Sequence, residues 1–160
     1  MNKLKLSLLI GMLMSSVSVF ADYAPASVQA ALKEMCPTAG DVAWSRDEAY
    51  YVADFMMNGF DTKVWFNAEA DWVMKQTDWV TMDEVPPAVY NTFAASEFSG
   101  DRVQNVTWVQ FPRWQAIVAV EVGRSNLQTK YQILFTPNGE ILRARNVTYM
   151  YNPLGASTFL

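Results

Sequence analysis

Carboxylates are the side chains of this sequence best suited to acid–base chemistry, because the chain contains no histidine. The absence of histidine excludes Ser-His-Asp and Cys-His catalysis, and any zinc or haem held by histidine. Seven of the 16 carboxylates form two groups, which are Asp47, Glu48 and Asp54, and then Asp71, Asp78, Asp83 and Glu84. Neither group has the spacing of a calcium-binding loop.

Hydrolysis by a carboxylate pair would need two of these side chains about 5–10 Å apart in one cleft. Their spacing along the chain does not place any two of them so, and the simpler expectation is a set of solvated loop residues. We therefore expect no enzyme, no metal and no cofactor. Hydrolysis ranks last among three functions considered, behind protein binding and small-molecule binding.

The single cysteine, Cys36, excludes an intramolecular disulfide and any multi-cysteine metal site. With no histidine to activate its thiol, we do not expect a catalytic thiolate. Cys36 precedes Pro37 at the end of a helical pattern, and we expect it to be a small buried hydrophobic residue there.

The first 21 residues have the pattern of a signal peptide. Lys3 and Lys5 precede an apolar run over residues 6–14, and Val19-Phe20-Ala21 places small residues at positions −3 and −1 of a cleavage site. A membrane anchor is the weaker alternative, because this apolar run is too short to span a bilayer. We expect a mature chain from residue 22 that is periplasmic or secreted, without stable insertion in a membrane.

The charge of the mature chain argues against nucleic acid as a partner. Without Lys3 and Lys5, the 12 basic residues fall to 10 against 16 acidic ones, which gives a net charge of −6. No cluster of lysine and arginine remains to neutralise phosphates. The remaining 139 of the 160 residues suit one globular domain, which we place at 22–152.

The elements that would position a site occur twice along the chain. Prolines open two helical patterns: Val28 and Leu32 share a face in the first, and Val89 and Phe93 share a face in the second. Each residue of the second pair lies 61 positions after its counterpart in the first. A Gly-Asp pair and a series of strand-like runs follow each helix. In the second copy an Asn138-Gly139 hairpin signal precedes the last of these runs, which starts at Ile141.

These patterns predict an α+β fold made of two tandem repeats, at about 25–84 and 85–151. Each repeat is a helix followed by three or four antiparallel strands, and the strands form one sheet with the helices on one face. The last eight residues, 153–160, show no periodicity, and we expect them to be a frayed C-terminal tail.

Several short motifs resemble the PepSY-like, β-lactamase-inhibitor-like (BLIP-like) proteins exported by bacteria. They are Tyr51-Val-Ala-Asp-Phe55, Val64-Trp-Phe66, Asp71-Trp-Val73, Pro86-Pro-Ala-Val89 and Pro137-Asn-Gly139. The resemblance covers about residues 42–147, and its motifs are structural rather than catalytic. It implies a tandem BLIP-like fold with an open concave face able to bind proteins, and it names no β-lactamase as a target.

Strand alternation predicts which side chains line that open face, because successive residues point to opposite sides of a sheet. Charged residues must avoid the core, so Glu121 sends Val118, Val120 and Val122 inward. The same argument predicts a recognition surface made of Tyr50, Asp54, Trp65, Glu121, Arg143, Arg145 and Tyr149.

Aromatic residues surrounded by arginine are typical of the hot spots of protein interfaces. We therefore expect a non-enzymatic exported module, inhibitor-like in kind, that binds an envelope or extracellular protein through this face. A periplasmic small-molecule or glycan binder is the alternative function. A solvated face whose aromatic residues merely pair across strands is the alternative for the surface itself.

Overall fold

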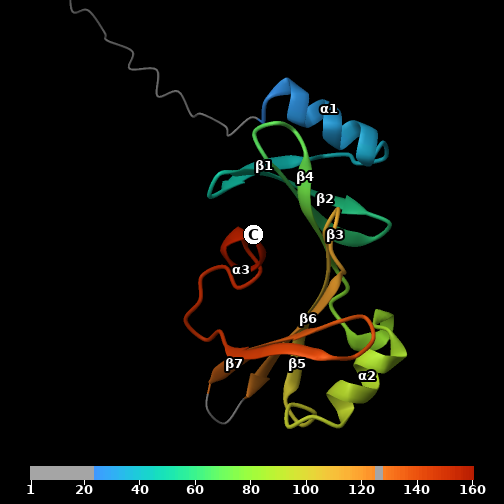
Figure 1. The fold of residues 1–160 in the computed structure, drawn as a ribbon, viewed down its shortest axis with the longest axis vertical. Helices are drawn as coiled ribbons and strands as arrows, with labels where there is room; N and C mark the ends of the chain where they lie inside the picture. The colour runs from blue at the N-terminus through green and yellow to red at the C-terminus, as the bar shows by residue number, and fades with distance from the viewer. Residues whose placement is uncertain (1–23, 125–127) are drawn as a thin grey trace, which may run out of the picture.

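The computed structural model describes residues 24–124 and 128–160, so the predicted signal peptide lies outside the described residues. Eight antiparallel strands form one sheet in which each strand pairs with its neighbour in the chain, as Figure 1 shows. The strands are β1 (Ala43–Asp47), β2 (Tyr50–Met57), β3 (Phe60–Phe66), β4 (Trp72–Asp78), β5 (Arg102–Gln110), β6 (Ile117–Arg124), β7 (Thr129–Phe135) and β8 (Ile141–Asn146). The α+β class with one antiparallel sheet agrees with the expectation.

The helix α1 (Ala26–Met35) precedes the first four strands, and α2 (Pro87–Ala94) precedes the last four. A third helix, α3 (Ala156–Phe159), follows the last strand. A 3-10 turn, Met82–Glu84, precedes α2. Pro87 opens α2, where its missing N–H costs nothing because the first N–H groups of a helix have no partner within it. No helix within the described residues is long and apolar enough to cross a membrane.

The helices α1 and α2 pack on the same face of the sheet. Val28 and Leu32 of α1 contact a cluster that includes Phe55, and Val89 of α2 contacts one that includes Phe135. A row of cross-strand partners joins the two clusters and therefore lies on one face; it runs through Phe55, Thr62, Thr77, Trp108, Val118 and Phe135. Figure 1 shows α1 and α2 at opposite ends of this face.

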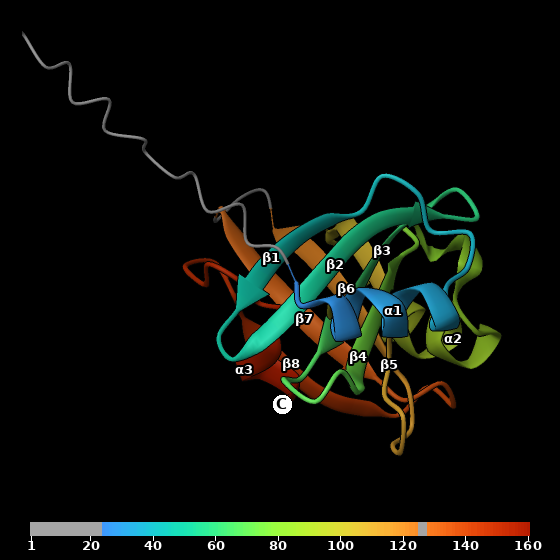
Figure 2. The same ribbon diagram turned by 90° about the horizontal axis from the view of Figure 1, so that it is seen from above.

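Tight turns hold the strands in this order. Asn58 and Gly59 have positive φ angles of 53° and 84°, as a two-residue hairpin turn requires. Gly139, in the predicted Asn-Gly turn between β7 and β8, has a φ of 87°, and a Cβ there would lie 2.6 Å from the carbonyl oxygen of Ala88 in α2. This turn therefore packs directly against a helix. Figure 2 shows how strongly the sheet twists between β2 and β7.

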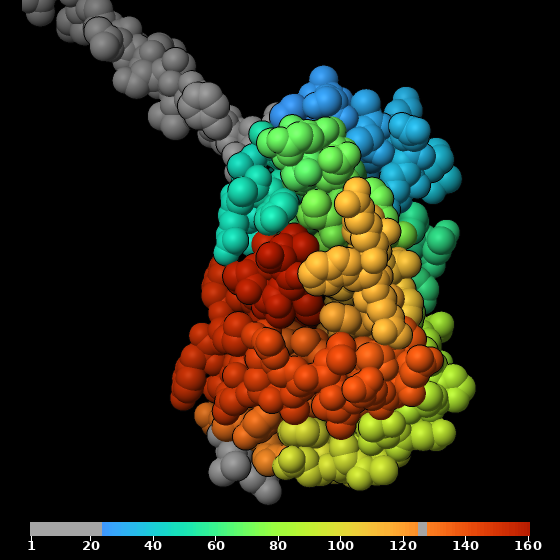
Figure 3. All heavy atoms as spheres, viewed as in Figure 1, coloured from blue at the N-terminus to red at the C-terminus, as the bar shows by residue number. Residues whose placement is uncertain are grey.

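The C-terminal tail, residues 153–160, is docked in the hollow of the sheet. Figures 1 and 3 show its short helix α3 on the concave side, away from α1 and α2. Leu154, Ala156 and Phe159 pack against a cluster that includes Trp65 and Leu134. The expectation that this segment frays is wrong, because its apolar side chains find a matching surface to bury.

Candidate functional site

The concave face of the sheet, opposite α1 and α2, carries the predicted surface residues that lie in strands. Asp54 pairs with Lys63, and Val52 with Trp65, across β2 and β3. Glu121 pairs with Gln132, which pairs in turn with Arg145 across β7 and β8. Because directly paired residues share a face, strand alternation assigned these side chains to the correct side of the sheet.

Trp65, however, is not displayed to solvent. Its side chain is only 3% exposed and lies beneath the tail, packed in the same cluster as Ala156. The indole Nε1 donates a hydrogen bond to Asp47 Oδ2 over 2.8 Å. Trp65 is therefore part of the floor of the concave face, and replacing it with alanine would leave a cavity rather than test a surface contact.

The remaining predicted residues differ in their surroundings. Tyr50 is half-buried against the cluster under the tail, Arg143 is exposed, and Arg145 is half-buried beside the tail. Tyr149 is 99% exposed and lies outside the sheet. The strand alternation used to place Tyr149 does not reach it, because β8 ends at Asn146, whose Oδ1 accepts hydrogen bonds from Thr148 and starts a turn.

Side chains from four strands bind the backbone of the tail. Gln76 Nε2 donates to the carbonyl oxygen of Leu154 over 2.6 Å, and Gln132 Nε2 to that of Pro153 over 3.0 Å. Arg145 donates to the same Pro153 oxygen over 3.0 Å. Asp47 Oδ2 accepts a hydrogen bond from the Ala156 N–H over 2.8 Å. The concave face thus offers donors and an acceptor placed for a polypeptide backbone.

Sequence reasoning did not identify Asp47, Gln76 or Gln132 as members of this site. Gln132 is fully buried and Gln76 is 6% exposed, so each needs a hydrogen-bond partner within the protein. One signal was present: Gln132 interrupts the otherwise apolar Tyr131–Phe135. A buried glutamine at such a position needs hydrogen-bond partners, and Gln132 finds them in Glu121 and Arg145 of the sheet and in the Pro153 carbonyl group of the tail.

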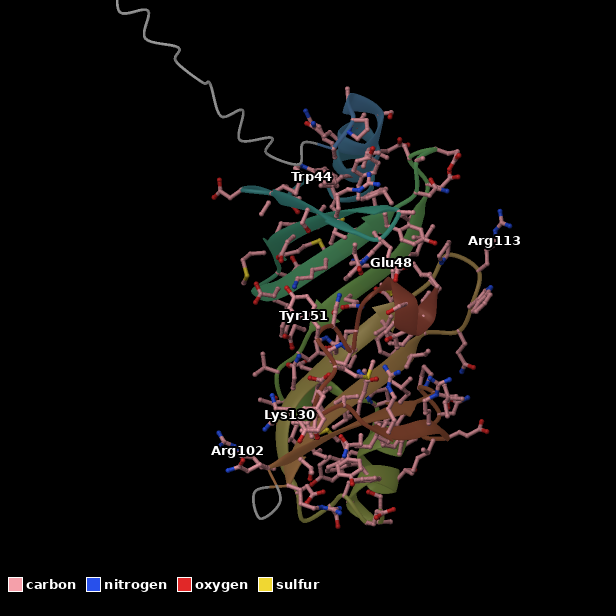
Figure 4. All side chains as sticks on the ribbon, turned by 90° about the vertical axis from the view of Figure 1, so that its left-hand side faces the viewer. Trp44, Glu48, Arg102, Arg113, Lys130 and Tyr151 are labelled. Atoms are coloured by element: carbon pink, nitrogen blue, oxygen red, sulfur yellow. The ribbon has the colours of Figure 1, made fainter. Side chains whose placement is uncertain are left out.

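A cleft of about 560 Å³ lies between the tail and the concave face. Tyr151, Pro153 and Leu154 line one side, and Figure 4 shows Tyr151 between the two halves of the sheet. The charged residues that line the cleft are Arg46, Lys63, Asp47, Asp54, Asp61, Asp78 and Glu121. Acidic side chains outnumber basic ones, so the cleft carries a net negative charge.

The charged groups near the tail include one exposed ion pair and two side chains whose pKa values are shifted by burial. Lys63 Nζ lies 3.4 Å from Asp54 Oδ2, an exposed ion pair that contributes little to stability. Burial raises the pKa of Glu121, although a hydrogen bond from Gln132 opposes that rise. Burial also lowers the pKa of Arg145, with a further contribution from the neighbouring Arg143. Within residues 24–124 and 128–160, no cluster of three acidic or cysteine side chains is arranged to bind a metal.

Comparisons with known proteins give the same fold. Residues 49–143 match the family described as "Putative beta-lactamase-inhibitor-like, PepSY-like". A solved structure of a DUF2874 family protein from Bacteroides uniformis is 80% identical, with a TM-score of 0.85, and covers 86% of this chain and all of its own. No curated protein matches the chain.

Two further solved structures extend the comparison. One, described as a putative periplasmic protein from Bacteroides eggerthii, is 72% identical with a TM-score of 0.85, over 86% of this chain and 99% of its own. The other, a BLIP-like protein from Bacteroides fragilis, is 31% identical with a TM-score of 0.72, over 79% of this chain and 89% of its own. The expected periplasmic or secreted localisation is confirmed by the first of these. The chain belongs to the PepSY-like, β-lactamase-inhibitor-like family that its short structural motifs resemble.

Proposed function

We propose that this protein is a non-enzymatic, inhibitor-like binding module that contacts an envelope or extracellular protein through the concave face. The observation that carries the proposal is the docked tail. Gln76, Gln132 and Asp47 bind backbone atoms of that segment, so the face already has the chemistry needed to hold a polypeptide. Hydrogen bonds to a backbone recognise an extended chain of many sequences.

The recognition residues of this proposal surround the tail. Tyr50 lines a pocket together with Phe159 of the tail, and Arg143 pairs with Leu134, which lies under the tail. Asp54 and Glu121 line the adjoining cleft. Arg145 holds the tail itself, Trp65 forms the floor, and Tyr149 lies on the loop that leads to the tail. A buried floor with an exposed charged rim is the usual anatomy of a protein interface.

A periplasmic small-molecule or glycan binder is the second candidate, and the cleft is what favours it. Its volume of about 560 Å³ lies within the range of small-ligand sites. Thr107 and Asn105 add hydrogen-bonding groups to the charged side chains of its wall. Such a polar cleft suits a hydrophilic ligand better than an apolar one.

We further propose that the domain consists of two tandem copies of one helix-plus-four-strand unit. The element order supports this, because α1 precedes β1–β4 in the same way that α2 precedes β5–β8. Duplication accounts for a sheet whose antiparallel strands pair in chain order through both halves.

The test compares capture of envelope proteins by the mature chain and by Arg143→Glu. Arg143 is exposed, so its reversal leaves the fold intact. Lys33→Glu is the matched control, because it makes the same charge change on an exposed position of α1, on the opposite face. We expect a partner that the control retains and Arg143→Glu loses, and then a weakening of about 1–3 kcal/mol with the purified partner.

Equal capture by Arg143→Glu and by the control would contradict the protein-binding proposal. Native mass spectrometry of the mature chain distinguishes the second candidate. A defined small ligand that dissociates from Asp54→Asn, a variant of the cleft wall, would favour it.

A further inference from the structure

The tail is bound to the concave face as a ligand would be bound. The face contributes side chains to the hydrogen bonds, whereas the tail contributes mainly backbone atoms, at Pro153, Leu154 and Ala156. No tail residue takes part in the ladder of the sheet. The contacts therefore specify the path of a backbone and are open to any segment that follows the same path.

Small residues let the tail come this close. A Cβ on Gly155 would lie 2.3 Å from the Asn152 side-chain nitrogen and 3.1 Å from Asp47 Oδ2. Ala156 is only 1% exposed, and its N–H reaches Asp47. A larger residue at Gly155 would press on Asp47 Oδ2, and a larger residue at Ala156 would meet the buried cluster around it.

Apolar contacts fix the two ends of the bound segment. Leu154 packs with the residues under the tail, next to the carbonyl group that Gln76 binds. Phe159 packs against Phe111 with ring centroids 6.0 Å apart and an interplanar angle of 56°. The concave face therefore recognises three features of the bound segment: two consecutive carbonyl groups, two small residues after them, and an aromatic ring three positions later.

The tail can leave without breaking the sheet. The residues leading to it are open to solvent, with Tyr149 and Tyr151 99% and 104% exposed. Release would expose Gln76, Gln132 and Asp47 to water, which can replace the hydrogen bonds they lose. The hydrogen-bonded pairing of strands β1 through β8 includes no residue of the tail.

We propose that residues 153–160 are a tethered ligand that occupies the concave face until a partner replaces them. The partner is a protein that presents a segment of the same chemistry: two consecutive carbonyl groups, two small residues and an apolar ring. This inference rests on the proposed function. It adds which kind of segment the partner presents and how the tail regulates access to the face. A tethered segment competes at an effective concentration of about 1 mM, so it lowers the apparent affinity of any competing segment.

The experiment uses a labelled, N-acetylated peptide with the sequence of residues 153–160 and measures its binding by fluorescence anisotropy. The mature wild-type chain is compared with Leu154→Ser/Phe159→Ser, which removes the apolar contacts of the tethered copy. We expect the peptide to bind the double variant at least about tenfold more tightly, because the competitor is weakened. Ser157→Ala, at an exposed tail position, is the control and should bind as the wild type does.

Two further variants test whether the peptide uses the same site. Gln132→Leu and Gln76→Leu, each made in the double-variant background, remove one donor to the backbone. We expect each to weaken peptide binding by about tenfold. Circular dichroism of each variant confirms that the sheet is intact. If one of the two fails to fold, the other carries the test.

Two results would overturn the tethered-ligand proposal. One is peptide binding by the folded double variant that is no tighter than binding by the wild type. The other is tight binding that survives Gln132→Leu and Gln76→Leu. The proposed function fails separately, because Arg143 lies outside the described hydrogen bonds to the tail. A peptide that exchanges normally in Arg143→Glu, together with unchanged protein capture, would retain the tethered ligand and contradict the protein-binding role.

Discussion

The two faces of the sheet are covered by different kinds of contact. Under α1 and α2 the contacts are apolar, and none of the described hydrogen bonds joins either helix to a strand side chain. Under the tail, apolar packing around Trp65 and Leu134 is combined with hydrogen bonds that join backbone atoms of the tail to the side chains of Gln76, Gln132 and Asp47. Hydrophobic contact is strong but has no direction, whereas a hydrogen bond to a backbone is directional and water can replace it. One face is therefore suited to permanent packing and the other to exchange.

Neighbouring residues of β7 give the largest expected difference between the faces. Phe135 is fully buried against the α2 cluster, and Leu134 is 5% exposed beneath the tail. Phe135→Ala should lower the free energy of unfolding by about 3–5 kcal/mol. Leu134→Ala should cost about 2 kcal/mol, because the tail can settle into the space. Urea unfolding measures both, and equal losses would contradict the contrast.

Two turn glycines, of which only one contacts α2, test how tightly that helix packs against the sheet. Gly139→Ala would force a Cβ against the Ala88 carbonyl of α2, whereas at Gly59 the same atom would meet open space. Both residues have positive φ, so alanine costs about 1–2 kcal/mol in each. We expect Gly139→Ala to cost about 1 kcal/mol more, because α2 must also shift. Thermal unfolding should show the lower midpoint for Gly139→Ala; the reverse order would show that the turn yields more easily than the helix contact implies.

A substitution on the concave face should have a local effect. Gln132→Leu removes the donor to the Pro153 carbonyl and leaves Arg145 without its acceptor on Gln132. The expected cost is about 1–2 kcal/mol. Hydrogen exchange should become faster at the Ala156 and Thr158 amides, which are hydrogen-bonded in the docked tail, and stay slow in β6. Faster exchange throughout the sheet would mean that the tail supports the whole fold.

The smallest effect is a dependence on pH in the cleft. Burial raises the pKa of Glu121 above its ordinary value of 4.5. The stability that this carboxyl contributes is therefore present below about pH 4.5 and is lost as the pH rises through its folded pKa. Glu121→Gln should be slightly more stable than the wild type at pH 7 and no more stable at pH 4. Urea unfolding at the two pH values checks this, and an advantage at pH 4 alone would contradict it.

Strand alternation predicted which side of the sheet most of the proposed recognition residues occupy. Glu121 and Lys63 marked the side of the sheet that avoids the helices, and their partners Gln132 and Asp54 lie on the same face. Alternation is a local rule, so it assigns a side chain to a face without knowing what covers that face. Trp65 shows the consequence: it lies on the predicted face of the sheet, but the tail buries it where exposure was predicted.

The docking of the tail on the concave face could not be predicted from local sequence patterns. Residues 153–160 have no periodicity, since a four-residue helix is too short to show one. The hydrogen bond from Ala156 to Asp47 joins positions 109 apart, and only the folded sheet brings them together. The prediction that Tyr149 lies on the concave face was wrong for a related reason. The strand β8 ends before this residue, and strand alternation does not mark where a strand ends.

The strict chain order of the strands has a consequence for how the protein matures. Each strand pairs with the strand made just before it, so a chain that is synthesised from its N-terminus can assemble its sheet from pairings between neighbours. The contact between Asp47 and Ala156 joins positions 109 apart, so it cannot form until the strands between them have been made. The hollow of the sheet is therefore filled last, after the strands that surround it.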